Sequence, residues 1–288
     1  MLPGDHTVGD HRDLDLPPPG PPSSAAEHAV PGLRAPFHAA GSHIGVELPG
    51  AQALFTTRRG GVSCRPYDSL NLAVTATGAT PGDDPGRVAV NRTLVSAQVA
   101  DGTYRFAHGR QVHGCHVTRV GKAPRDDWRT PARGARAADG QATALKEVAA
   151  VVLVADCLPV AIAGEGAVAM IHAGWRGLAG GVLEAGVRTL RALGAVSPLV
   201  AAIGPGAGGC CYEVGPEVLA SFARVDREPR GRLRLDLKAI AAARLEGAGV
   251  AEVHDVGLCT LCCDPSLLFS HRREGGRTGR QAGIAWRR

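Results

Sequence analysis

The clearest hydrophobic pattern lies in the middle of the chain. Residues Val148–Val154 (VAAVVLV) are all apolar and rich in β-branched side chains, which is typical of a strand buried on both faces. The stretches LPVAIA (158–163) and AVAMIHA (167–173) have the same character and are separated by Gly164-Glu165-Gly166. This pattern predicts a buried strand followed by a β-hairpin with a glycine turn.

Helical and strand-like patterns alternate irregularly along the rest of the chain, with at least one hairpin. We therefore expect an α+β fold with mixed β-sheets flanked by helices, as one domain over residues 36–288. The first 35 or so residues are rich in Pro, Asp and Gly and lack periodicity, so we predict a disordered N-terminal tail. The expected helices cover residues 84–97, with Asp84 as N-cap, 178–193 and 235–247; two short strands are expected within 46–63, and a strand-like stretch at 105–120.

Composition narrows the class of protein. The net charge of +5 and the 20% of charged residues are spread along the chain, which argues against a nucleic-acid surface and leaves room for a small anionic ligand. No run approaches the roughly 18 to 20 apolar residues that span a bilayer, and the N-terminus does not resemble a signal peptide. We therefore expect a cytoplasmic protein that does not act at a membrane and whose eight cysteines are reduced.

The predicted hairpin places a cysteine close to a histidine. With a two-residue loop at Gly164-Glu165, Cys157 falls directly opposite His172, and a three-residue loop leaves the pair diagonal. Directly opposed residues have Cβ atoms about 4.5–5.5 Å apart, a separation that allows both side chains to bind one zinc ion. A small core cysteine and a hydrogen-bonded histidine explain the same residues as well. The pattern leaves the third ligand open among His108, His113 and His116.

A series of short motifs in fixed order resembles one family. The motifs run from FTTRRGGVS and PYDSLNLA through GDDP, NR, QVHG, ADCLPV, IHAGWRG and IGPGAGGCCYEVG to FSHRREGGRTGRQAG. Together they are similar to the YfiH-like laccase-domain proteins, once described as multicopper polyphenol oxidases and now associated with purine nucleoside phosphorylase activity. The resemblance implies a layered α/β/β/α arrangement and a zinc site made by His113, Cys157 and His172. Three protein ligands with an open fourth position are typical of a catalytic zinc.

The resemblance also implies an activity and its substrates. The family phosphorolyses adenosine, inosine, guanosine and methylthioadenosine and deaminates adenosine, so we expect purine nucleosides and phosphate as partners of a monomer or weak homodimer. Zinc-bound hydroxide could attack C6 of adenine, whereas phosphorolysis needs donors around an oxyanion. We consider Arg58, Arg176, Arg272 and the glycine loop at 204–209 as that cradle, with Asn71 as a weaker candidate for the sugar hydroxyls. A structural or solvated role is the alternative for each.

Other function classes use the same residues. A laccase with copper is disfavoured because the 11 histidines include no His-x-His pair, although copper could occupy the same site. A cysteine hydrolase would use Cys157 as nucleophile and His172 as base. Some relatives are linked to peptidoglycan-precursor editing, an amide hydrolysis. A binding module without catalysis would need a fourth ligand such as His116.

Five further cysteines lie in two short motifs, Cys210-Cys211 and Cys259-x-x-Cys262-Cys263. A C-x-x-C pair is compatible with a second, structural zinc. Reduced thiols without a metal explain these residues adequately, and the family does not require a second metal. We therefore expect free thiols here.

Overall fold

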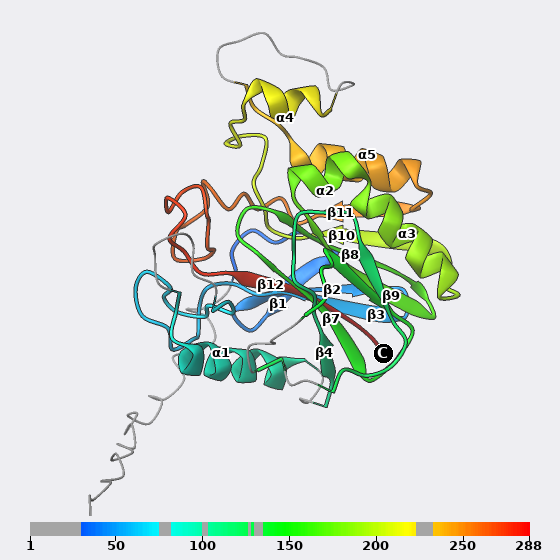
Figure 1. Cartoon of the computed structure of the whole chain (residues 1–288), viewed down its shortest axis with the longest axis horizontal. Helices are drawn as coiled ribbons and strands as arrows, with labels where there is room; N and C mark the ends of the chain where they lie inside the picture. Colours follow the sequence, from blue (N-terminus) through cyan, green and yellow to red (C-terminus); the bar gives the residue numbers. More distant parts are fainter. Residues whose placement is uncertain (1–29, 75–81, 100–102, 126–127, 130–134, 223–232) are drawn as a thin grey trace, which may run out of the picture.

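The computed structural model describes residues 30–74, 82–99, 103–125, 128–129, 135–222 and 233–288. It forms one α+β domain of four layers (Figure 1): a helix, two mixed sheets face to face, and a further group of helices. The predicted fold class is therefore confirmed. The predicted tail falls mostly on residues 1–29, which lie outside the described residues, and its boundary stays a prediction.

The first sheet has the order β1-β2-β3-β12-β7-β4. All its neighbours are antiparallel except β4 and β7, which are parallel. The C-terminal strand β12 lies between β3 and β7 and so joins the two ends of the chain in one sheet. The strands are β1 (Phe37–Ala40), β2 (His43–Leu48), β3 (Ala51–Phe55), β4 (Arg105–Ala107), β7 (Val148–Val154) and β12 (Gln281–Arg287).

The second sheet has the order β11-β10-β8-β9-β6-β5. Parallel pairs stand at both edges and antiparallel pairs in the centre. The central hairpin is the one predicted from the sequence. The strands are β5 (Val117–Val120), β6 (Gly140–Thr143), β8 (Leu158–Glu165), β9 (Ala167–Ala173), β10 (Val196–Ile203) and β11 (Glu252–Asp255).

Three apolar clusters fill the spaces between the layers. One packs the first sheet on α1, through residues such as Val95 and Val151. The second lies between the two sheets and includes Phe55 and Met170. The third packs the second sheet on α3 and α5, with Ile171 among its members. Because both faces of each sheet are covered, the central strands are apolar throughout, as the apolar run of β7 predicted.

Two of the three helix predictions are confirmed. Helix α1 (Pro85–Gln98) begins after Asp84, whose side chain accepts a hydrogen bond from the Arg87 N–H. Helix α5 (Leu237–Gly247) begins after Asp236 in the same way. A short α4 (Pro216–Ala220) was not predicted.

The third prediction, a continuous helix over 178–193, is wrong in detail. The structure has α2 (Trp175–Gly180) and α3 (Val182–Ala192), separated by Gly181 at φ 90°. A left-handed residue ends a helix because its backbone cannot continue the hydrogen-bond ladder, and glycine takes this conformation at little cost.

The register of the hairpin differs from the predicted one. Gly164 pairs with Ala167 and Pro159 pairs with His172, so the two-residue turn is Glu165-Gly166. Gly166 at φ 97° supplies the left-handed conformation that this turn requires. Cys157 consequently lies just beyond the end of β8, diagonal to His172 rather than directly opposite. The strand-like stretch 105–120 is likewise divided into β4, an irregular segment and β5.

Among the described residues, no helix has the length and apolar character needed to cross a bilayer.

His43 on β2 makes stability depend on pH. Its side chain is fully buried, its Nδ1 accepts a hydrogen bond from the Thr57 N–H at 3.3 Å, and its Nε2 has no protein partner. Burial lowers the pKa of His43 to about 4.

We expect the contribution of His43 to the free energy of unfolding to be fully present above pH 6.5. It should be lost as the pH drops toward 4, because the unfolded chain takes up the proton first. The loss is about 3 kcal/mol. Chemical denaturation at several pH values measures this loss of unfolding free energy. Compared with the wild type, the loss should be smaller by about this amount in His43→Asn and unchanged in the exposed His38→Asn. Equal pH dependence in all three proteins would contradict the assignment.

Candidate metal centre and active site

Three side chains from separate parts of the chain meet at one end of the second sheet. His113 comes from the irregular segment before β5, Cys157 from the turn between β7 and β8, and His172 from β9. One ligand atom from each lies within 4.8 Å of the others, and the two imidazole rings meet edge to face with centroids 4.8 Å apart. The structure thus brings together the three residues that the family resemblance implied. His108 and His116 are not members of this group.

Asp139 holds this group together. It immediately precedes β6, has no exposed surface and accepts a 2.8 Å hydrogen bond from Nδ1 of His172. Its two oxygens also accept backbone N–H groups from Val112, His113 and Gly114 at 2.8–3.2 Å. One buried carboxylate therefore orients one histidine by its ring and another by its backbone.

Backbone conformation also aims the ligands. His113 adopts φ 60° and Asp156 adopts φ 87°, a region that costs a non-glycine residue roughly 1–2 kcal/mol. The hydrogen bonds that three successive N–H groups donate to Asp139 stabilise the conformation of His113. Gly174 follows His172 by two residues, and a Cβ there would lie 2.9 Å from the Cys157 sulfur and 3.0 Å from the His113 ring. Glycine is therefore needed where the ligands converge.

The electrostatics of the group favour a thiolate. Burial raises the pKa of Cys157, but His172 and the hydrogen bonds from both histidines outweigh it and lower that pKa to about 6. Burial lowers the pKa of His172, whereas Cys157 and Asp139 raise it to about 9. The pKa of Asp139 is lowered: burial opposes this, and the hydrogen bonds from His172, Gly114 and Val112 outweigh it.

The donor set fits a zinc ion. Zinc binds neutral imidazole nitrogen and thiolate sulfur, and its histidine ligands typically donate their second nitrogen to a carboxylate. The bond from His172 Nδ1 to Asp139 leaves Nε2 of His172 free to bind a metal. Of the residues that the structure describes, three and not four side chains make up the group, so a zinc ion held there would keep one position for water or substrate.

A pocket of about 380 Å³ begins at Trp175, three residues after His172. Trp175 and Arg176, which directly follow Gly174, form part of its wall. The guanidinium of Arg176 lies over the Trp175 ring at 4.2 Å, and that of Arg272 lies over the Tyr212 ring at 5.3 Å. Burial raises the pKa of Tyr212, and the nearby Cys157 adds to this rise. The remaining lining residues are Glu213, Val214, Gly215, Glu217 and Val218.

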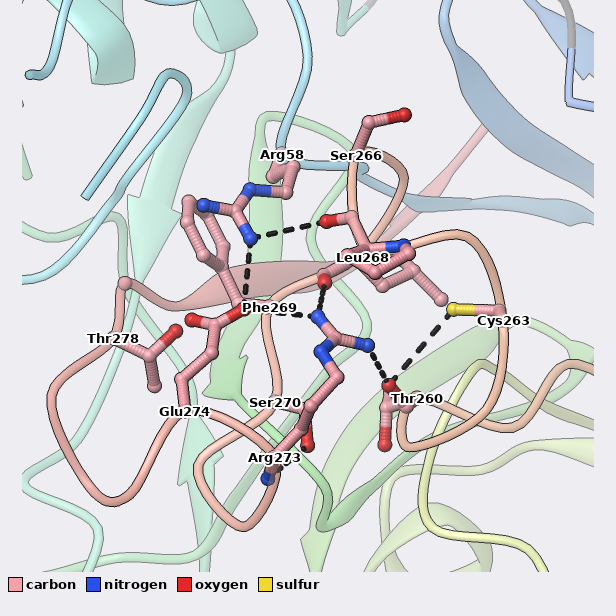
Figure 2. A network of polar contacts seen from close by, with 12 residues as sticks. Arg58, Thr260, Cys263, Ser266, Leu268, Phe269, Ser270, Arg273, Glu274 and Thr278 are labelled. Atoms are coloured by element: carbon pink, nitrogen blue, oxygen red, sulfur yellow. Dashed lines mark hydrogen bonds and ion pairs between the residues drawn. The ribbon is translucent and has the colours of Figure 1, made fainter. Parts of the chain in front are cut away.

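The structure separates the four predicted substrate residues into two pairs. Arg176 and Arg272 line the pocket. Arg58 instead donates to Glu274, to the Pro265 carbonyl and to Asp68 and lies over the Phe269 ring, in the network of Figure 2. In the same network Arg273 donates to Glu274, Leu268 and Thr260. These contacts give Arg58 a bracing role and do not favour substrate binding.

Asn71 is fully buried. Its Nδ2 donates to the Ala73 carbonyl and to Asp83, while its Oδ1 accepts from the N–H groups of Ala73 and Arg280. With its donors and acceptor occupied inside the protein, it has no group left for a sugar hydroxyl. The predicted glycine loop at 204–209 also packs closely: a Cβ at Gly206 would lie 2.4 Å from Leu158.

Sequence reasoning missed the residues that position the others. Asp139 could have been found, because a histidine ligand calls for a carboxylate partner and this one precedes a short strand of small residues. Asp156 accepts from Thr260 Oγ1 at 2.6 Å and from the Arg272 N–H at 2.7 Å. Arg280 and His271 were also missed; the pKa of Arg280 is lowered by burial, and Cys157 opposes that change. No local pattern brings these residues together.

Comparisons with known proteins agree with the fold and the motifs. Residues 52–288 match the family described as multi-copper polyphenol oxidoreductase laccase. The purine nucleoside phosphorylase of Xylella fastidiosa (strain Temecula1) is 41% identical over 83% of this chain and 93% of its own. That of Streptomyces coelicolor is 40% identical over 82% and 96%.

Among solved structures, YlmD from Geobacillus stearothermophilus has a TM-score of 0.76 and 32% identity, covering 89% of this chain and 98% of its own. The Bacillus licheniformis hypothetical protein YfiH has a TM-score of 0.78 and 28% identity, covering 88% and 100%. The resemblance seen in the sequence is confirmed.

Replacing Asp139 should weaken metal binding without removing a ligand. In Asp139→Asn the carboxylate charge that supports His172 is lost, so we expect zinc affinity to fall about 10–100-fold. Competition with a chromophoric chelator measures this, with the exposed Glu246→Gln as a control that should match the wild type. Unchanged affinity in Asp139→Asn would show that the carboxylate does not support the site.

Proposed function

Because this chain belongs to the multi-copper polyphenol oxidoreductase laccase family, and curated relatives are named purine nucleoside phosphorylases, we propose that it is a zinc-dependent purine nucleoside phosphorylase. The observation that carries this proposal is the three-ligand group together with a pocket whose wall begins at Trp175, three residues after His172, and contains two arginines and two aromatic rings. The proposed substrates are adenosine, inosine, guanosine and methylthioadenosine, with deamination of adenosine as a second activity.

The pocket suits the two chemical parts of the reaction. Arg176 and Arg272 provide fixed positive charge for phosphate, which guanidinium groups bind through charge-assisted hydrogen bonds. Trp175 and Tyr212 provide aromatic faces of the kind on which bases stack. In phosphorolysis a phosphate oxygen attacks the anomeric carbon while the bond to the purine nitrogen breaks, so phosphate and sugar must be held side by side.

His113, Cys157 and His172 would hold the zinc, and zinc in such a site acts as a Lewis acid and lowers the pKa of bound water. The protein's own part is to orient these side chains. Asp139 keeps His172 in the tautomer protonated at Nδ1, and Asp156 fixes the backbone of Arg272 beside the pocket. Both carboxylates are buried, which keeps these bonds strong.

The direct test is chromatography of purine nucleosides incubated with the protein, with and without phosphate. We expect free base and ribose 1-phosphate that form only when phosphate is present. Inosine from adenosine without phosphate would establish the deaminase activity. No conversion of any of the four nucleosides by zinc-loaded protein would refute the proposal.

Arg272 should be needed for phosphate. In Arg272→Gln we expect the KM for phosphate to rise about 10–100-fold, the value of a lost charge-assisted hydrogen bond, with a smaller change in the KM for the nucleoside. The exposed Arg277→Gln is the matched control and should keep both values. An equal rise in both KM values would point to disturbed structure rather than a phosphate contact.

The linked residues Cys157, His172 and Asp139 also favour a second candidate, a cysteine-dependent amide hydrolase, because they form a nucleophile, a base and an orienting carboxylate. Cys157→Ala abolishes activity under both mechanisms, whereas a chelator abolishes only the zinc-dependent one. We expect activity to be lost on chelation and restored by zinc, with Cys64→Ala as an unaffected control. Copper binding with a blue absorption band would instead support the laccase reading.

A further inference from the structure

Four cysteines form a second cluster, separate from the three-ligand group. The sulfur atoms of Cys210, Cys211, Cys259 and Cys262 all lie within 4.8 Å of one another. They come from two loops: one follows β10 and the other follows β11. Free thiols were expected at these positions, and only the tertiary structure unites the two motifs.

The two loops are held together by backbone contacts independent of the sulfurs. Gly206 forms a parallel bridge with Cys259, and the N–H of Thr260 donates to the Gly206 carbonyl at 3.1 Å. The Cys263 N–H donates to the Cys259 carbonyl at 3.0 Å, which turns the chain so that Cys262 comes back toward Cys259. The positions of the thiols are therefore set by the fold.

The spacing of the sulfurs suits a metal. Four sulfurs at the Zn–S distance of about 2.3 Å in a tetrahedron are separated by roughly 3.8 Å. The sulfurs of Cys210 and Cys262 are 3.7 Å apart. A disulfide between them would need about 2.05 Å, and each thiol has further thiols within reach.

Backbone groups around Cys259 favour a thiolate. The Gly208 N–H donates to the Cys259 sulfur at 3.3 Å, and Cys259 is the buried member of the cluster. A Cβ at Gly208 would lie 3.2 Å from the Cys210 sulfur and 3.4 Å from that of Cys259. The glycine thus leaves room for the sulfurs and donates to one of them, as groups around metal-bound sulfur do.

We propose that these four cysteines bind a second zinc ion in a closed, structural site. Four thiolates satisfy tetrahedral zinc without a water ligand, in contrast to the open three-ligand group. All four cysteines are free of disulfides, and a metal is the ordinary reason for a C-x-x-C pair and a second cysteine pair to converge as free thiols.

The ion would join the loop that lines the pocket to the loop after β11. Cys211 precedes Tyr212, which lines that pocket. Cys259 precedes Thr260, which donates to Asp156 and whose carbonyl accepts from Arg273 (Figure 2). The second zinc therefore stabilises the pocket wall without contacting substrate, and the proposal does not depend on which reaction the protein catalyses.

Metal analysis of the purified protein, produced with zinc and without affinity-tag metals, tests the stoichiometry. We expect two zinc ions per chain in the wild type, one in Cys262→Ser, one in Cys157→Ser, and none in the double variant. Cys263→Ser is the matched control, because Cys263 neighbours Cys262 but is not a member of the cluster, and should keep two. One zinc in the wild type, with none lost in Cys262→Ser, would overturn the proposal.

A second measurement needs no variant and so does not depend on folding. Cys210 and Cys262 are exposed, so a thiol reagent should modify them in native protein only after a chelator removes the metal. If a reductant, and not a chelator, makes these cysteines reactive, they form a disulfide. If they are modified at once, they are free thiols. Either result would overturn the proposal. Cobalt titrated into metal-free protein should give sulfur-to-cobalt absorption several times stronger than a one-thiolate site gives, because the intensity grows with the number of bound thiolates.

Discussion

The buried carboxylate of Asp139 is the interaction on which the candidate centre depends. It accepts hydrogen bonds from His172 and from three successive backbone N–H groups around His113. The histidines come from separate elements, and Asp139 links them because β6 pairs with β9 on one side and β5 on the other. A buried carboxylate without these donors would be costly, so the same bonds that orient the ligands also make the carboxylate tolerable in the core.

Asp156 has the corresponding role on the other side of Cys157. Its side chain accepts from Thr260 and from the backbone of Arg272, and its carbonyl accepts from Ala207. The loops after β10 and β11 and the segment before β12 are thereby fastened to the turn that carries the cysteine. Arg58 and Arg273 add a second fastening through Glu274. These segments have no regular secondary structure, and buried hydrogen bonds hold them in position. The proposed second zinc would add metal–sulfur bonds between two of these loops.

The family description as a copper oxidase and the relatives' names as phosphorylases differ in chemistry. A cysteine thiolate with two imidazoles accepts either zinc or copper, and copper binds such ligands more tightly. The proposed function rests on the pocket that begins three residues after His172. Two guanidinium groups and two aromatic rings in this pocket suit an anionic co-substrate and a flat base, as phosphorolysis requires.

Local sequence determined the central strands, the hairpin, and helices α1 and α5, because apolar runs and capping residues are short-range signals. Together with the family motifs, which are also short-range signals, it indicated the three members of the ligand group. Tertiary structure decided what depends on distant segments. The hairpin register follows Gly166 rather than Gly164-Glu165, and Arg58 and Asn71 turn inward because partners such as Glu274, Asp83 and Arg280 lie far away in the sequence. The partners of His172 and the convergence of four cysteines also arise between distant segments, since sheet pairing, and not spacing along the chain, sets which loops meet.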